Sequence, residues 1–184
     1  ELIGGLLDDD TVLSLISETL TDSDSQPSAE QESTAVAATT YDEFDFTLTM
    51  DQGSEVQTAQ GSANAQGAIN FPVGGVNSIL TWVPQEGSSP LALVSGAYDI
   101  LKASQTNVSF ASVNDGEITV NGQNGVYLGF KSADDTWTSL GGGLIGAWAC
   151  ADAGTAYTLT LTGADAGTAQ IRFDRILENF TYAA

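Results

Sequence analysis

The chain has 184 residues, 42% of them hydrophobic, which is enough for one domain with a sizeable core. It carries 24 acidic residues against four basic ones, a net charge of −20, with no histidine and a single cysteine. This composition excludes nucleic acid as a partner, because almost no basic side chain is available to neutralise phosphates. It also excludes histidine-dependent catalysis, a structural zinc site and an internal disulfide.

The negative charge is unevenly distributed. All charged residues within 1–101 are Asp or Glu. The four basic residues come later, at Lys102, Lys131, Arg172 and Arg175. Such acidity is typical of a salty, extracellular or halophilic setting, and an acidic binding surface is the alternative. The chain starts at Glu1 without a basic leader, which predicts removal of a signal peptide and an extracytoplasmic location, secreted or on the cell surface. No stretch has the length of a transmembrane segment.

Residues 1–40 are predicted to be an acidic N-terminal arm and linker. Apolar residues recur with helical spacing up to Leu20, which predicts a short helix that begins near Asp10 or Thr11. Its start carries the acidic run Asp8, Asp9 and Asp10. The helix dipole favours negative charge there, and a calcium site is the weaker alternative, because the spacing does not match an EF-hand. Residues 21–40 have the composition of a linker.

Residues 41–184 are predicted to form a single α+β domain. Apolar and polar residues alternate over 43–50, which predicts a strand, and 51–67 is predicted to be a loop. A short strand follows at 69–73, where Pro72 favours a sheet edge or a strand end. The segment 79–83 is apolar on both faces, as in a central strand. Ser89 and Pro90 then begin a helix that ends near Lys102, with Leu91, Val94, Tyr98 and Leu101 on one face.

The second half of the domain is predicted to contain five strands and a closing helix. The strands cover 108–113, 118–120, 126–130, 145–150 and 157–162, and the last two form a hairpin. In the hairpin, Trp148 and Cys150 are expected on one buried face, opposite Ile145 and Ala147. The period then changes to a helical stripe made of Ala169, Phe173, Ile176, Leu177 and Phe180.

Short connections between successive strands favour antiparallel pairing, and helices between and after strand runs favour an α+β layer fold. The segment from residue 41 to the end resembles the PsbP/Mog1/DcrB-like domain family. The resemblance is carried by the alternating strand 44–50, by Ile79–Val83 with the following helix, by the glycine-turned hairpin 118–130, and by the terminal helix up to Phe180. It implies a curved antiparallel sheet flanked by helices, and extracytoplasmic binding or assembly roles. No binding residue can be transferred.

The loop 133–143 is the candidate binding site. Trp137 is either an anchor for a partner or ligand, or a core residue that folds back onto the sheet. Asp134 and Asp135 beside it are candidate binding residues or ligands of a hard cation. Asp42, Glu43 and Asp45 form another acidic group, for which a solvated strand face is the simpler interpretation. The run Gly141–Gly143 indicates a hinge or a close approach to the sheet.

The sequence therefore predicts an extracytoplasmic, non-enzymatic binding or assembly module without a cofactor, calcium aside. A protein partner or self-association is expected. The alternative is a structural subunit of an extracellular filament or surface assembly, in which residues 1–40 dock on a neighbouring copy through 2–7 and 35–38. A third interpretation is an enzyme that uses a carboxylate pair, for which no acidic pair in the sequence stands out.

Overall fold

The structure is a computed structural model, and it describes residues 38–51, 53–61 and 66–182. The predicted arm helix, the acidic run Asp8–Asp10 and nearly all of the 1–40 arm lie outside these residues. Among the described residues, no helix has the length and apolar character needed to cross a membrane.

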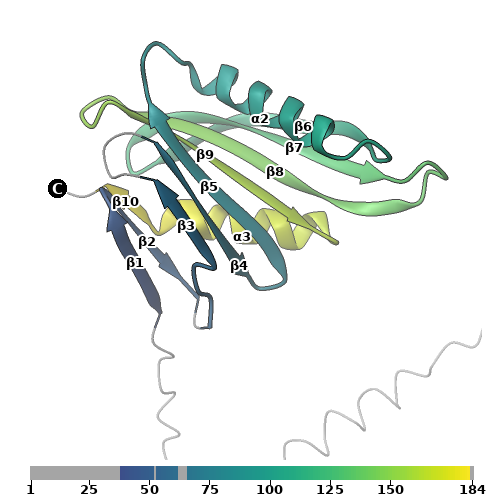
Figure 1. The fold of residues 1–184 in the computed structure, drawn as a ribbon, viewed down its shortest axis with the longest axis horizontal. Helices are drawn as coiled ribbons and strands as arrows, with labels where there is room; N and C mark the ends of the chain where they lie inside the picture. Colours follow the sequence, from purple (N-terminus) through teal and green to yellow (C-terminus); the bar gives the residue numbers. More distant parts are fainter. Residues whose placement is uncertain (1–37, 52, 62–65, 183–184) are drawn as a thin grey trace, which may run out of the picture. The chain divides into compact units, whose positions relative to one another are not determined.

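A twisted, fully antiparallel sheet of seven strands forms the centre of the fold (Figure 1). Its strand order is β3-β4-β5-β9-β8-β7-β6. A smaller antiparallel sheet has the order β1-β2-β10. The strands are β1 (Thr39–Phe44), β2 (Phe46–Met50), β3 (Thr58–Gly61), β4 (Gly67–Val73), β5 (Val76–Pro84), β6 (Ser109–Val120), β7 (Gln123–Ala133), β8 (Ser139–Cys150), β9 (Thr155–Gly163) and β10 (Phe180–Tyr182).

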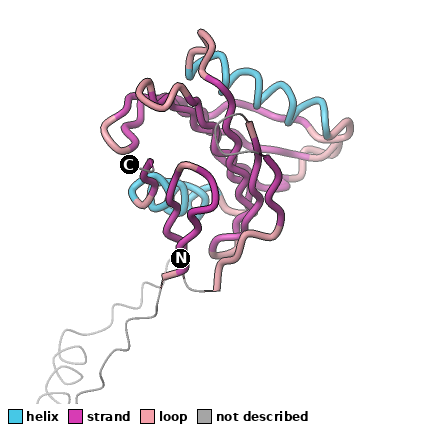
Figure 2. The backbone as a smooth tube through the Cα atoms, turned by 60° about the vertical axis from the view of Figure 1, so that its left-hand side comes forward, coloured by secondary structure: helices cyan, strands magenta, loops and turns pink. Residues whose placement is uncertain are grey.

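The two helices lie on opposite sides of the large sheet (Figure 2). Helix α2 (Pro90–Ser104) begins at Ser89, whose hydroxyl accepts a hydrogen bond from the Ala92 backbone N–H, and it packs over β7, β8 and β9. Helix α3 (Ala166–Glu178) begins at Asp165, which accepts a hydrogen bond from the Thr168 backbone N–H. The α+β class with helices flanking an antiparallel sheet is therefore confirmed.

The β8–β9 hairpin has a core on each face, as predicted. Trp148 stacks on Tyr157 at a ring distance of 5.7 Å, and both are buried on the α3 side. Ile145 and Ala147 are buried on the α2 side. Cys150 is a buried free thiol. Successive residues of β8 are buried on opposite faces of the sheet, which explains why this strand is apolar throughout.

An ion-pair network joins the end of β2 to α3. Arg172 Nη1 lies 2.9 Å from Asp51 Oδ2, and Arg175 Nη1 lies 3.2 Å from Asp51 Oδ1. Lys102 pairs with Asp99 on α2 at 2.8 Å. Three of the four basic side chains of this acidic chain are thus engaged in ion pairs within the domain.

Several predicted element boundaries are wrong. The strand predicted over 43–50 is two strands, because the chain reverses at Asp45 and β1 pairs with β2. The predicted loop 51–67 contains β3, a strand of small and polar residues that pairs with β4 through its backbone. The two strands predicted over 108–120 are one edge strand, β6, in which a bulge near Val113 interrupts the alternation.

Two predictions of burial also need correction. The strand 79–83 lies inside the sheet as β5, but only one of its faces is buried, and Ile79 is 36% exposed on the other. Leu91 is predicted on the same helix face as Val94, which is buried, yet Leu91 is 67% exposed. Phe180 is buried, but it lies in β10 and not on the helix, because α3 ends at Glu178.

Candidate functional site: the Trp137 loop

Residues 134–138, here called the Trp137 loop, connect the long strands β7 and β8. Ala133 pairs with Ser139 at the base of the loop, after a register shift from Ser132. The two strands continue as neighbours inside the large sheet, between β9 and the edge strand β6, so the loop stands on a rigid hairpin. Rigid strands that present a short loop are a common way to hold binding residues in place.

Asp134 organises the loop through its carboxylate. Its Oδ1 accepts hydrogen bonds from the Thr136 hydroxyl at 2.7 Å, from the Thr138 backbone N–H at 2.8 Å and from the Thr136 backbone N–H at 2.9 Å. These donors, the Thr136 hydroxyl foremost, hold the pKa of Asp134 below its usual value. The carboxylate therefore stays ionised and shapes the backbone.

Backbone hydrogen bonds close the loop further. The Trp137 N–H donates to the Asp134 carbonyl at 3.1 Å, and the Asp134 N–H donates to the Thr138 carbonyl at 3.0 Å. Trp137 has a φ of 65°, the left-handed region, where a bulky side chain is an outlier. Its side chain is 82% exposed. The exposed indole contradicts the interpretation that Trp137 folds back onto the sheet, and its role as an anchor stays a prediction.

The candidate residues therefore have different positions in the loop. Asp134 holds the loop, Trp137 lies at its tip, and Asp135 is exposed beside them. Asp42 and Glu43 lie exposed on β1, and Asp45 lies at the chain reversal. In the part of the chain that the structure describes, no group of three acidic or cysteine side chains is placed to hold a metal ion.

The sequence gives no signal for one further feature, an opening beside α2 that is lined from three separate elements. Its residues, from α2, β6 and β7, come together only through strand order and helix packing. Leu91, an exposed residue of α2, borders it.

Removal of the Asp134 side chain is expected to loosen the loop. In Asp134→Ala, the amides of Thr136 and Thr138 lose their shared acceptor, so lower heteronuclear NOE values are expected at residues 136–138, with Asp135→Ala as the control. Because the pKa of Asp134 is lowered, ordering by the carboxylate is complete at neutral pH and is lost as the pH falls through this lowered pKa. If the amide chemical shifts of Thr136 and Thr138 did not change with this titration, the hydrogen bonds assigned to Asp134 would be contradicted.

Comparison with protein-family models finds no match, and comparison with curated proteins finds none either. Among solved structures, the solution structure of cyanobacterial PsbP (CyanoP) from Synechocystis matches with a TM-score of 0.60 at 12% identity. The match covers 85% of this chain and 98% of that one. A Pseudomonas aeruginosa protein of unknown function has a TM-score of only 0.34 at 14% identity, over 75% of this chain and 89% of its own.

The match to cyanobacterial PsbP spans nearly the whole of that protein. At this identity it informs on the fold alone. The chain therefore has the PsbP-like fold, an antiparallel sheet with helices on both faces.

Proposed function

We propose that this protein is an extracytoplasmic, non-enzymatic binding or assembly module, and that it contacts a protein partner through the Trp137 loop. One observation carries the proposal: Trp137 is 82% exposed in a left-handed backbone conformation. For a bulky residue this conformation costs about 1–2 kcal/mol. The exposed indole recovers little of that cost by burial within the domain. A tryptophan held out on a rigid loop is the kind of residue that anchors protein interfaces.

The absence of histidine and the structural use of Asp134 support a role without catalysis. The strongly acidic composition and the single, buried thiol are consistent with an extracytoplasmic location. The PsbP-like fold adds support through the family resemblance, which implies binding or assembly roles outside the cytoplasm.

The test is photocrosslinking in the native host. A benzophenone amino acid is placed at position 137 and, as a control, at Ile171, which is 65% exposed on α3. A discrete adduct is expected from position 137 alone, and mass spectrometry identifies the partner. An adduct with a second copy of this chain would instead favour the structural-subunit alternative. Equal labelling from both positions would contradict the proposal.

Trp137→Gly provides a matched stability measurement. Glycine adopts positive φ without steric cost, so the free energy of unfolding is expected to be unchanged or to rise by up to about 1 kcal/mol, while the crosslinked partner no longer co-purifies. Urea denaturation checks the first expectation. A loss of more than about 1 kcal/mol would show that the indole packs against the domain, and would contradict its role as an exposed anchor.

A further inference from the structure

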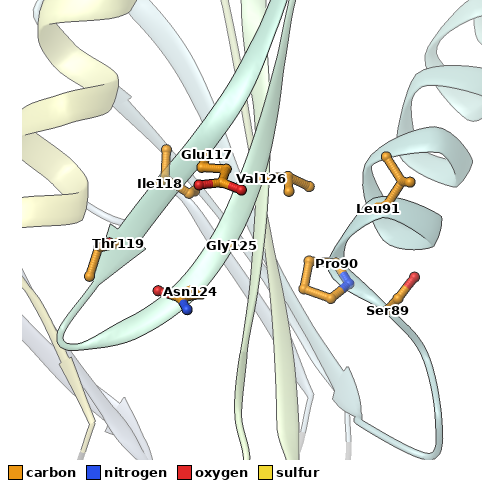
Figure 3. Close-up of a pocket in the computed structure, with 9 residues that line it drawn as sticks. All are labelled: Ser89, Pro90, Leu91, Glu117, Ile118, Thr119, Asn124, Gly125 and Val126. Atoms are coloured by element: carbon orange, nitrogen blue, oxygen red, sulfur yellow. The ribbon is translucent and has the colours of Figure 1, made fainter.

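A groove lies between α2 and the β6–β7 hairpin, away from the Trp137 loop, with which it shares no lining residue. Two adjoining cavities of about 410 Å³ and about 300 Å³ form it, and both are bordered by Leu91, Glu117 and Val126. Figure 3 shows Leu91 and Pro90 at the start of α2 and Val126 on the hairpin on opposite sides of the opening. We call this opening the α2 groove.

The walls of the α2 groove are apolar. Leu91, Val94 and Tyr98 follow each other at helical spacing along α2, a length of about 10 Å. Val126 and Leu128 of β7 form the opposite wall. Leu91 is 67% exposed, so an apolar surface on this helix lacks cover within the described domain.

The outer rim of the groove is acidic. Asp115 and Glu117 of the edge strand β6 are both exposed, and they line the groove. In the sheet register Asp115 faces Leu128 and Glu117 faces Val126, so each carboxylate stands beside an apolar side chain of the wall. An occupant is therefore recognised by an apolar side toward α2 and by positive charge toward β6.

Strand β6 is poorly suited to accept an added strand. It carries a bulge between Ser112 and Asn114, followed by the two acidic residues Asp115 and Glu117. Bulges and charges of this kind protect sheet edges from pairing with another strand. Of the two elongated elements that could occupy the groove, a strand and a helix, a helix that lies beside α2 on the same face of the sheet is therefore favoured.

The N-terminal arm cannot supply the positive charge. Residues 1–37 contain nine acidic residues and no lysine or arginine, so the arm is repelled by the rim. A second copy offers four basic side chains, of which three are engaged in ion pairs. We infer that the α2 groove docks an amphipathic helix of a different protein, apolar along one side and rich in lysine or arginine along the other.

The apolar wall and the acidic rim are expected to contribute unequally to the binding affinity. The apolar wall supplies most of the affinity, because exposed carboxylates form weak, salt-screened pairs. The rim selects cationic helices and fixes their orientation. Substitution in the wall is thus expected to weaken binding strongly, and substitution in the rim to remove the preference for basic peptides.

The test uses the full chain and two labelled helical peptides of about five turns, one with leucine on one face and lysine on the other, and one with glutamine in place of lysine. Fluorescence anisotropy measures the affinity. Leu91→Asp is expected to weaken binding of the lysine peptide by about tenfold or more, while Ile100→Asp changes it by less than about twofold. Ile100 is the matched control, 71% exposed on the same helix and outside the groove lining.

The combined variant Asp115→Asn, Glu117→Gln is expected to weaken the lysine peptide and leave the glutamine peptide unchanged. Amide shift changes in the native chain are expected at Val94, Tyr98 and Val126. Equal effects of Leu91→Asp and Ile100→Asp, or no saturable binding, would overturn the inference. Displacement by an unlabelled peptide of residues 1–37 would make the arm the occupant. Trp137→Gly is expected to bind the lysine peptide normally, so this inference and the proposed function fail separately.

Discussion

Replacing Gly143 with alanine is expected to lower the free energy of unfolding by more than about 3 kcal/mol or to prevent folding. Gly143 lies in β8, where it is paired with Phe130 of β7 and with Thr162 of β9. A Cβ at this position would overlap the backbone carbonyl oxygen of Leu161 and would lie 2.9 Å from the Phe130 ring. Backbone in the middle of a sheet cannot shift without breaking the ladder on both sides.

Gly96→Ala is the matched control for this prediction. Gly96 lies inside α2, where an added Cβ would have no neighbour within 4 Å. Alanine is expected to raise the free energy of unfolding by about 0.5–1 kcal/mol, because it restricts the unfolded chain and favours the helix. Urea denaturation of both variants measures the contrast. A Gly143→Ala protein as stable as the native chain would contradict the close packing of β8.

The glycine run shows how far sequence reasoning reaches in the fold. Gly141–Gly143 indicates a hinge or a close approach, and the close approach is correct for all three residues, because a Cβ on any of them would overlap a backbone carbonyl oxygen of a neighbouring strand. Alternation and apolar content locate the β8–β9 hairpin, because a strand that is buried on both faces has consecutive apolar residues. β3 escaped prediction, since its pairing with β4 uses backbone groups and small side chains.

The candidate binding surfaces are harder to predict from the sequence than the strands are. Whether Trp137 points outward depends on the hydrogen bonds that Asp134 makes, and no composition rule places tryptophan at positive φ. Asp134 is a candidate binding residue in the sequence, and the structure adds that its carboxylate accepts three hydrogen bonds within its own loop. The α2 groove depends on the contact of α2 with β7, so Leu91 could not be distinguished from a core leucine by its spacing.

Phe180→Ala is the second variant with a large expected effect, a loss of about 3–5 kcal/mol in the free energy of unfolding. Phe180 is 1% exposed and begins β10. Its ring lies 5.0–5.5 Å from a cluster of four aromatic rings, those of Tyr157, Trp148, Phe46 and Tyr182. Because Phe46 belongs to the small sheet and Trp148 to the large one, the cavity would open where the two sheets meet.

Thr181→Ala separates loss of the ring from disturbance of the strand. Thr181 is exposed and pairs with Thr47 in the same ladder, so its substitution is expected to change stability by less than about 0.5 kcal/mol. Near-ultraviolet circular dichroism of Phe180→Ala is expected to lose intensity, since Trp148 and Tyr157 lose a packed neighbour. Equal stability of the two variants would mean that the small sheet is held by its ladder and by the Asp51 ion pairs with Arg172 and Arg175, and not by the aromatic cluster.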